Sequence, residues 1–379
     1  MQKVLHGFLL GLAILFPSSC AITKIGQSPA PTSDAEWDIA SPGSVGFDEK
    51  ILDKLTQDIK DNKFSNIHAV LVEYDGKLIY EQYFGGPDEI WGRPIGSRDF
   101  GRDSLHDLRS VSKSVTSLVL GIALAGNYDS ALNRPLPSFF PKLRTSPDMQ
   151  TVNLHHALTM TAGIEWNEMT EPYTGSTNDD NRLFSTRDPV ALVLNRPLAS
   201  KPGTDWYYNG GLTQVAAGVV QEVSGKPLDV VAKERLFAPL GITTFDWIGS
   251  PAWHPSMPAA AWGLRMRARD LAKIGSVCLH DGRWKGRQIV PKEWIERSTR
   301  RHVETIGAWS NGNMWGYGYQ FWVGNLPQGH RIVAARGLGD QNIYIVPEEK
   351  LVVTTYAGAY NSGVKNSERI LRRILSAKR

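Results

Sequence analysis

Strand patterns occur near both ends of this chain and are scarce in its middle. Early in the chain, the segments 69–74 and 77–84 flank Asp75-Gly76, a dipeptide that supplies the positive φ angles of tight hairpin turns. Late in the chain, short β-rich segments separated by Gly, Pro and charged residues cover 319–323, 331–335, 342–346 and 351–356. We therefore expect one antiparallel sheet built from the two ends of the chain.

Helical periodicity occupies the rest of the chain. Residues 48–61 and 110–125 each show the spacing of a helix, and the middle of the chain holds Pro-rich loops and helical segments. This order predicts an α+β fold, with an antiparallel β-sheet flanked by helices and an inserted, mostly helical domain. The expected sheet domain comprises 35–127 and 261–379, and the expected insertion is 128–260.

The N-terminus has the pattern of an export signal. Lys3 precedes an apolar run over 7–16, and small residues follow up to Cys20. The run is too short to span a bilayer, for which about 20 residues are needed. Residues 1–20 are therefore expected to be a signal peptide, and Cys20 is either a lipid anchor or lost by cleavage. Residues 21–34 resemble a flexible tether, and the protein is expected to be periplasmic or a membrane-anchored lipoprotein.

Composition excludes several classes of function. The 42 basic and 38 acidic residues give a net charge of +4 without a long basic run, so no nucleic-acid partner is expected. The sequence contains no phosphate-binding glycine loop and no H-E-x-x-H spacing, so we expect no cofactor and no metal site. No G-x-S-x-G elbow occurs, which argues against an α/β-hydrolase. The second of two cysteines, Cys278, lies in an apolar run and is expected to be a small buried hydrophobe.

A serine and a lysine open the predicted helix 110–125. In Ser110-Val111-Ser112-Lys113 the two residues at i and i+3 share a helix face, so the Ser110 hydroxyl and the Lys113 amine can meet. The rest of the helix carries no charge and is expected to be buried. Burial lowers the pKa of a lysine, and a neutral amine can take a proton from serine. The N–H of Ser110 at a helix start can also stabilise an oxyanion. S-x-x-K alone is short enough to occur by chance.

A second motif is Tyr207-Tyr208-Asn209, which precedes two glycines and the apolar helix 212–223. A tyrosine beside a lysine ammonium ionises more easily, and Tyr207 could then serve as base to serine and acid to the leaving group. The alternative is that both tyrosines are aromatic packing beside Trp206.

Taken together, these motifs resemble the serine β-lactamase and penicillin-binding-protein superfamily, in its class C-like branch. Further segments agree with this family in order, among them LTMTAGIEW, FAPLGI, WGLRMRARDLAKIG and QNIYIVPEEKLVVTT, so the resemblance covers about 45–375. The chain looks most similar to the 6-aminohexanoate-dimer hydrolase-like and family VIII esterase group. The resemblance implies an α/β domain with an inserted helical domain, and Ser110 as nucleophile with Lys113 and Tyr207 as proton carriers.

The resemblance also assigns the remaining site residues. Asn209 would orient Lys113 or the substrate. The third family motif, K-T-G or H-T-G, falls on 335–337, where Gly337 matches and the N–H of Leu338 would be the second oxyanion donor. Ala335 stands in place of the motif's cation, which in β-lactam-active members helps to hold the substrate carboxylate. Arg336 is a poor substitute, because adjacent strand residues face opposite sides of a sheet.

Three aromatic residues complete the set of candidates. The resemblance implies that Tyr173 covers the pocket and hydrogen-bonds the substrate. Trp262 and Trp315 either line the cleft or pack in the core.

The sequence thus predicts a serine hydrolase that acts on small carboxylic esters or linear amides through an acyl-enzyme. The alternatives are a penicillin-binding, β-lactamase or D-alanyl-D-alanine carboxypeptidase-like activity, or a non-catalytic protein that binds cell-wall peptides. The sequence leaves open whether Lys113 or Tyr207 is the general base, and it leaves the physiological substrate and the oligomeric state undetermined.

Overall fold

The computed structural model describes residues 36–379 except 174, 255, 305–314, 361–362 and 364. The predicted signal peptide, Cys20 and the predicted tether therefore lie outside the described residues. Among the residues described, no helix has both the length and the apolar character needed to cross a bilayer.

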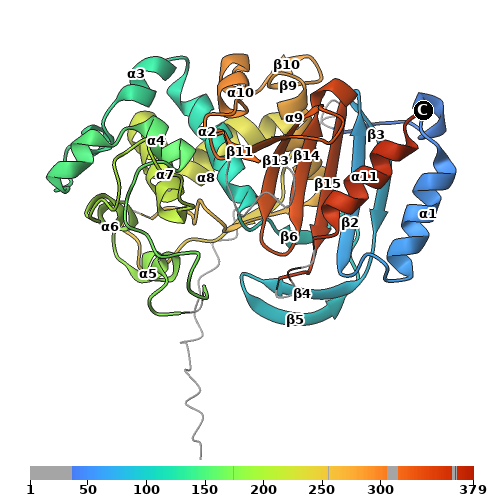
Figure 1. Ribbon diagram of the computed structural model, residues 1–379, viewed down its shortest axis with the longest axis horizontal. Coiled ribbons are helices and arrows are strands. Elements are labelled where there is room, and N and C mark those ends of the chain that lie inside the picture. Colours follow the sequence, from blue (N-terminus) through green and yellow to red (C-terminus); the bar gives the residue numbers. More distant parts are fainter. Residues whose placement is uncertain (1–35, 174, 255, 305–314, 361–362, 364) are drawn as a thin grey trace, which may run out of the picture.

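An eight-stranded sheet forms the centre of one half of the molecule (Figure 1). Its order is β1-β3-β2-β15-β14-β13-β12-β11, and all neighbours are antiparallel except β1 and β3. The strands are β1 (Asp38–Ile39), β2 (Ile67–Tyr74), β3 (Lys77–Tyr83), β11 (Gly316–Tyr317), β12 (Trp322–Asn325), β13 (Arg331–Gly337), β14 (Gln341–Val346) and β15 (Leu351–Ala357). Early and late strands meet where β2 pairs with β15, which confirms the prediction of a sheet built from both ends. Of the strand expected at 319–323, only residues 322–323 lie in a strand, at the start of β12.

Helices cover both faces of this sheet. Helices α1 (Glu49–Lys60) and α11 (Ser367–Ala377) lie on one face, and α2 (Val111–Leu124) and α9 (Ala268–Leu279) pack against the other. The alternation of side chains along β13 separates the two cores, because successive strand residues face opposite sides. Val333 and Ala335 belong to the core with α2 and α9, whereas Ile332 and Ala334 belong to the core with α1 and α11.

The remaining helices gather beside the sheet, in the green and yellow part of Figure 1. They are α3 (Tyr128–Asn133), α4 (Leu154–Thr159), α5 (Asp179–Ser185), α6 (Pro189–Leu194), α7 (Gly210–Ser224) and α8 (Leu228–Val231), while α10 (Lys292–Ser298) packs on α2. The smaller sheets pair β4 (Gly86–Ile90) with β5 (Arg93–Arg98), β9 (Arg283–Trp284) with β10 (Arg287–Gln288), and β8 (Leu264–Arg267) with both β6 (Leu105–Asp107) and β7 (Phe245–Trp247). The α+β class is as expected, and 128–260 as a separate insertion stays a prediction.

Helix α2 lies between the sheet and the helical half and contacts both. Twelve of its fourteen residues are buried, which explains why the sequence places no charge after Lys113 in this helix. Gly121 gives room for a neighbouring aromatic ring, because a Cβ there would lie 2.1 Å from the indole of Trp294. The helix is therefore fixed from several sides, and so is the residue that caps its N-terminus, Ser110.

Candidate active site

The chain turns sharply just before Ser110. Strand β6 ends at Asp107, and Arg109 then takes a left-handed backbone conformation with φ of 49° before Ser110 caps α2. Such a φ is uncommon for a residue other than glycine and persists only where the surroundings hold it. The Arg109 guanidinium lies 3.2 Å from Glu89 and 3.4 Å from Asp107, and these two ion pairs hold it in place. The turn thus presents the Ser110 hydroxyl at the helix start.

Lys113 meets Ser110 as the helical spacing predicts. Its Nζ lies 3.3 Å from the Ser110 hydroxyl and 3.1 Å from the backbone oxygen of Ala261, and the side chain is almost completely buried. Burial lowers the pKa of Lys113, but negative charge on Tyr208, Glu168 and Asp180 raises it by more, so the pKa lies above its usual value. The sequence analysis predicted a lowered pKa for Lys113 because it took only burial into account. In the structure the pKa of Lys113 is raised instead.

The tyrosine beside Lys113 is Tyr208. Its hydroxyl is hydrogen-bonded to Ser110 and Lys113, and its ring lies 4.7 Å from the Lys113 Nζ. Burial raises the pKa of Tyr208, which the Lys113 charge partly offsets. Tyr207, which the motif count singled out, is 37% exposed. The tyrosine hydroxyl near Ser110 therefore belongs to Tyr208 and not to Tyr207. The loop before α7 turns Tyr208 inward, where its ring packs near Trp206 and Trp322.

Asn209 has a local structural contact. Its side-chain oxygen accepts a hydrogen bond from the N–H of Leu212, 3.1 Å away, and so caps α7. When the Y-x-N spacing is counted from Tyr208, the third position is Gly210, which has no side chain to offer. The expected role of Asn209 in orienting Lys113 stays a prediction, and its established contact is the helix cap.

Two carboxylates that the sequence analysis did not single out lie beside Gly210. Glu168 and Asp180 are 2% and 8% exposed. A Cβ on Gly210 would lie 2.8 Å from Asp180 Oδ1 and 3.2 Å from Glu168 Oε2. Neither residue belongs to a short motif with Ser110 or Tyr208, so nothing in the sequence separates this pair from the other acidic residues of the segment 162–185.

The third motif lies against the start of α2. A Cβ on Gly337 would lie 2.4 Å from the backbone oxygen of Leu108 and 3.2 Å from the Ser110 nitrogen, so the strand approaches closely because residue 337 has no side chain. Leu338 follows at the strand end and is exposed. Arg336 is ion-paired with Glu368 of α11 at 3.1 Å, on the opposite face from α2. It therefore does not replace the missing cation at Ala335.

The aromatic candidates are divided between the site and the core. Tyr173 donates a hydrogen bond to Glu168 at 3.2 Å, although its side chain is 41% exposed. Trp262 follows Ala261, whose oxygen accepts from Lys113, and it packs on Phe184 with 5.5 Å between ring centroids. Trp315 is 1% exposed and belongs to the core beneath α1 and α11.

Comparisons with known proteins identify the family of this chain. The family model described as Beta-lactamase matches residues 61–377. The chain belongs to the beta-lactamase family. It is similar to the esterase EstB of Burkholderia gladioli, with 27% identity over 50% of this chain and 49% of the relative. It is also similar to the 6-aminohexanoate-dimer hydrolase of Paenarthrobacter ureafaciens, with 27% identity over 67% of this chain and 66% of the relative.

Solved structures of this family share the fold. A Bacillus anthracis protein whose name assigns it to the 6-aminohexanoate-dimer hydrolases superposes with a TM-score of 0.71 and 20% identity, over 92% of this chain and 88% of the other. A family VIII carboxylesterase superposes with a TM-score of 0.66 and 17% identity, over 90% and 98%. At identities of 20% or less, these structures establish a shared fold only. The segment that matches EstB spans about half of that relative's length.

A buried polar network lies beneath the turn that carries Ser110. His68 Nδ1 and His106 Nε2 are 2.9 Å apart, and Asp88 approaches His106 to 3.4 Å. These three side chains bring their ligand-type atoms within 4.8 Å of one another, as in some metal sites. However, Arg98 lies 3.4 Å from Asp88, and the positive charges of Arg98, Arg265 and Arg109 all act on His106. A divalent cation would add to this positive charge. We therefore interpret the His68–His106–Asp88 network as a structural support for the turn before Ser110.

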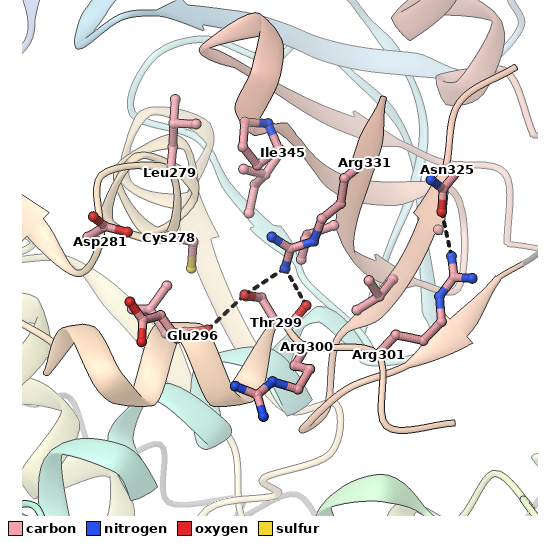
Figure 2. A pocket seen from close by; sticks show the side chains of 15 residues that line it. Cys278, Leu279, Asp281, Glu296, Thr299, Arg300, Arg301, Asn325, Arg331 and Ile345 are labelled. Carbon is pink, nitrogen blue, oxygen red and sulfur yellow. Dashed lines mark hydrogen bonds between the residues drawn. The ribbon is translucent and has the colours of Figure 1, made fainter. Parts of the chain in front are cut away.

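Figure 2 shows a pocket that lies apart from the Ser110 site. It has a volume of about 400 Å³ between α9, α10 and the strands β12–β14. Arg331 donates to Thr299 and Arg301 donates to Asn325 at its wall (Figure 2). Burial raises the pKa of the Cys278 thiol in this wall to about 12, which agrees with an unreactive, buried cysteine. None of the residues that line this pocket belongs to the Ser110 site.

Proposed function

We propose that this protein is a serine hydrolase that cleaves carboxylic esters or linear amides through an acyl-enzyme on Ser110. The observation that carries the proposal is the meeting of three groups at the start of α2. The Ser110 hydroxyl contacts the Lys113 Nζ at 3.3 Å and the Tyr208 hydroxyl by a hydrogen bond. A nucleophile within reach of two proton-carrying groups is the arrangement that covalent acyl transfer needs.

The chemistry would proceed in two halves. Ser110 Oγ attacks the carbonyl carbon, its proton passes to the Lys113–Tyr208 pair, and the carbonyl oxygen becomes an oxyanion near the N–H groups of Ser110 and Leu338. The oxyanion collapses, the bond to the alcohol or amine breaks, and that leaving group takes the proton. Water then attacks the acyl-enzyme by the same proton route and releases the acid and free Ser110.

Two observations favour esters and linear amides over β-lactams. Ala335 provides no charge for a substrate carboxylate at the third motif, and Arg336 is engaged with Glu368 on the opposite face of the sheet. The relatives named above are an esterase and a 6-aminohexanoate-dimer hydrolase. Tyr173, Trp262, Gly337 and Leu338 are proposed to form the substrate side of the site.

The test is a substrate panel assayed with wild type and Ser110→Ala. It includes p-nitrophenyl acyl esters, a chromogenic cephalosporin and a linear aminohexanoate dimer. We expect ester or dimer hydrolysis with a burst followed by turnover, and a loss of at least about 10³-fold in Ser110→Ala. Ser376→Ala, on an exposed position of α11, is the control and should match wild type. Full ester hydrolysis by Ser110→Ala would contradict the proposal, and stable labelling by a fluorescent penicillin without turnover would favour a binding protein.

We also propose that residues 1–20 direct export, with Cys20 as the lipid-attachment site or lost with the signal. The support is the sequence pattern alone: a basic start, a short apolar run and small residues before Cys20. Mass spectrometry of the mature protein from its membrane and soluble fractions distinguishes a lipidated Cys20 from cleavage, and an unprocessed N-terminus would contradict both.

A further inference from the structure

The pocket in Figure 2 combines a positive charge with apolar walls. Its volume of about 400 Å³ lies in the range of small-molecule sites. Three of the residues that line it, Val323, Val333 and Ile345, are only 2% exposed and give it an apolar floor. Arg331, the first residue of β13, extends toward Thr299 (Figure 2). The pocket therefore offers a cation and an apolar surface to the same small molecule.

Arg331 differs from the other arginines that the fold takes out of solvent. Every other buried or partly buried arginine among the described residues has a carboxylate oxygen within 4.0 Å, as Arg265 has from Asp107 and Arg269 has from Glu81. Arg331 is partly buried and has no such carboxylate in the described part of the chain. A guanidinium stays charged in a protein, so its positive charge is open to a ligand.

Only one amino group of Arg331 is used within the described residues. Its Nη2 donates to the backbone oxygen of Thr299 at 2.5 Å and to the Thr299 hydroxyl at 3.0 Å. Thr299 caps the C-terminus of α10, where a cation is favourable. Nε and Nη1 have no hydrogen-bond partner in the described structure, and neither is a fully buried atom. They are therefore left as donors for an anion, with the charge of Arg301 beside them and that of Glu348 opposing it beyond ion-pair distance.

The acidic residues that line the pocket have a cation of their own. Asp281 lies 2.9 Å and Glu296 3.7 Å from the Nζ of Lys292. These two carboxylates are therefore balanced by Lys292 and do not neutralise Arg331. The pocket is thus suited to a ligand with one anionic group and an apolar body.

We propose that this pocket binds a small organic carboxylate, with the carboxylate at Arg331 and the apolar body against Val333 and Ile345. An inorganic anion would use the guanidinium alone, and a neutral apolar molecule would use the floor alone. A monocarboxylate with an apolar body gains from both, by charge-assisted hydrogen bonds and by burial of apolar surface. The site shares no residue with the Ser110 site, so the inference does not depend on the reaction proposed there.

The direct test is a crystal structure of the wild-type protein with 4-bromobenzoate, in which anomalous scattering locates the bromine atom. We expect the bromine in this pocket beside Val333 and Ile345, with the carboxylate facing Arg331. Because wild type is used, the result does not depend on whether a variant folds. Bromine at the Ser110 site alone, or at neither place, would overturn the proposal.

Calorimetry of the same ligand tests the part played by the charge. Arg331→Gln should weaken binding by about 10- to 100-fold, the effect of losing hydrogen bonds to a charged group. Arg372→Gln is the matched control, since Arg372 is exposed on α11 and does not line the pocket, and its affinity should equal that of wild type. Any binding at the Ser110 site contributes equally to both variants. Urea unfolding checks that Arg331→Gln is folded.

Two further ligands separate the charge from the apolar body. 4-Bromobenzamide has the same shape without the charge, and inorganic phosphate has charge without the apolar body. Each should bind at least about 10-fold more weakly than 4-bromobenzoate. Equal affinities of the two arginine variants, or an affinity of either ligand equal to that of 4-bromobenzoate, would contradict the assignment.

Discussion

At the scale of single residues, the site depends on which tyrosine turns inward. Tyr208 is 6% exposed and hydrogen-bonded to Ser110 and Lys113, whereas Tyr207 is 37% exposed. The two residues are chemically identical and adjacent, so composition and motif spacing cannot separate them. Only the path of the loop before α7 gives one of them the buried position.

This pair offers a matched test. Tyr208→Phe removes the hydroxyl that we expect to carry the proton, and kcat/KM for a p-nitrophenyl ester should fall by about 10²- to 10⁴-fold. Tyr207→Phe removes the same atom one residue away and should stay within a few-fold of wild type. Steady-state kinetics of both variants, with circular dichroism to check folding, decides between them. The reverse ranking would restore the tyrosine role to Tyr207.

At the scale of elements, the site is a junction between the N-terminus of α2 and the end of β13. Gly337 allows the two to touch, because residue 337 faces the backbone of Leu108 and Ser110 at distances that a side chain would not permit. Contact between backbones positions N–H groups more rigidly than side-chain contact would, which suits an oxyanion site.

Gly337→Ala should therefore push β13 away from α2. A Cβ 2.4 Å from the Leu108 oxygen is a severe clash, and we expect a cost of about 1–3 kcal/mol in the free energy of unfolding and at least a 10-fold loss in kcat/KM. Urea unfolding and ester kinetics measure the two effects. Gly101→Ala is the control, because a Cβ there meets nothing within 4 Å. Equal behaviour of the two variants would mean that the close approach at Gly337 is unimportant.

At the scale of the whole molecule, the fold also buries ionisable groups that take no part in the proposed chemistry, namely the histidines beneath the turn that carries Ser110. Burial lowers the pKa of His106 to about 3, and nearby arginines contribute, while the backbone oxygen of Asp107 opposes the shift. Burial and the neighbouring His106 likewise lower the pKa of His68 to about 3, against the charge of Asp88. Both histidines are thus neutral in the folded protein at pH values where the unfolded chain would protonate them.

Stability should consequently fall on acidification. Between pH 6.5 and 3 the unfolded state binds more protons at His68 and His106 than the folded state, so each histidine lowers the free energy of unfolding by up to about 1.4 kcal/mol per pH unit as pH falls. Urea unfolding of wild type and His106→Gln at pH 7.5, 6.5 and 5.5 measures this. The variant should be less stable at pH 7.5 but lose less stability between the three pH values. Parallel pH profiles for the two proteins would contradict a neutral buried His106.

The sequence by itself determined what depends on neighbours along the chain. Ser110 and Lys113 meet because a helix places residues i and i+3 on one face. The strands of the sheet can be predicted from the alternation of apolar and polar residues and from the turn residues between them. The pairing of early with late strands also follows, since a sheet needs partners and the middle of the chain offers few.

The tertiary structure decided what depends on residues far apart in the sequence. It selected Tyr208 over Tyr207, paired Arg336 with Glu368 of α11, and brought Glu168 and Asp180 beside Gly210. Negative charge on Tyr208, Glu168 and Asp180 reversed the expected direction of the Lys113 pKa shift, because burial alone disfavours an ammonium whereas nearby negative charge favours it. The pKa of a buried group depends on all the charges around it in space, and a local sequence pattern does not show which distant residues supply them.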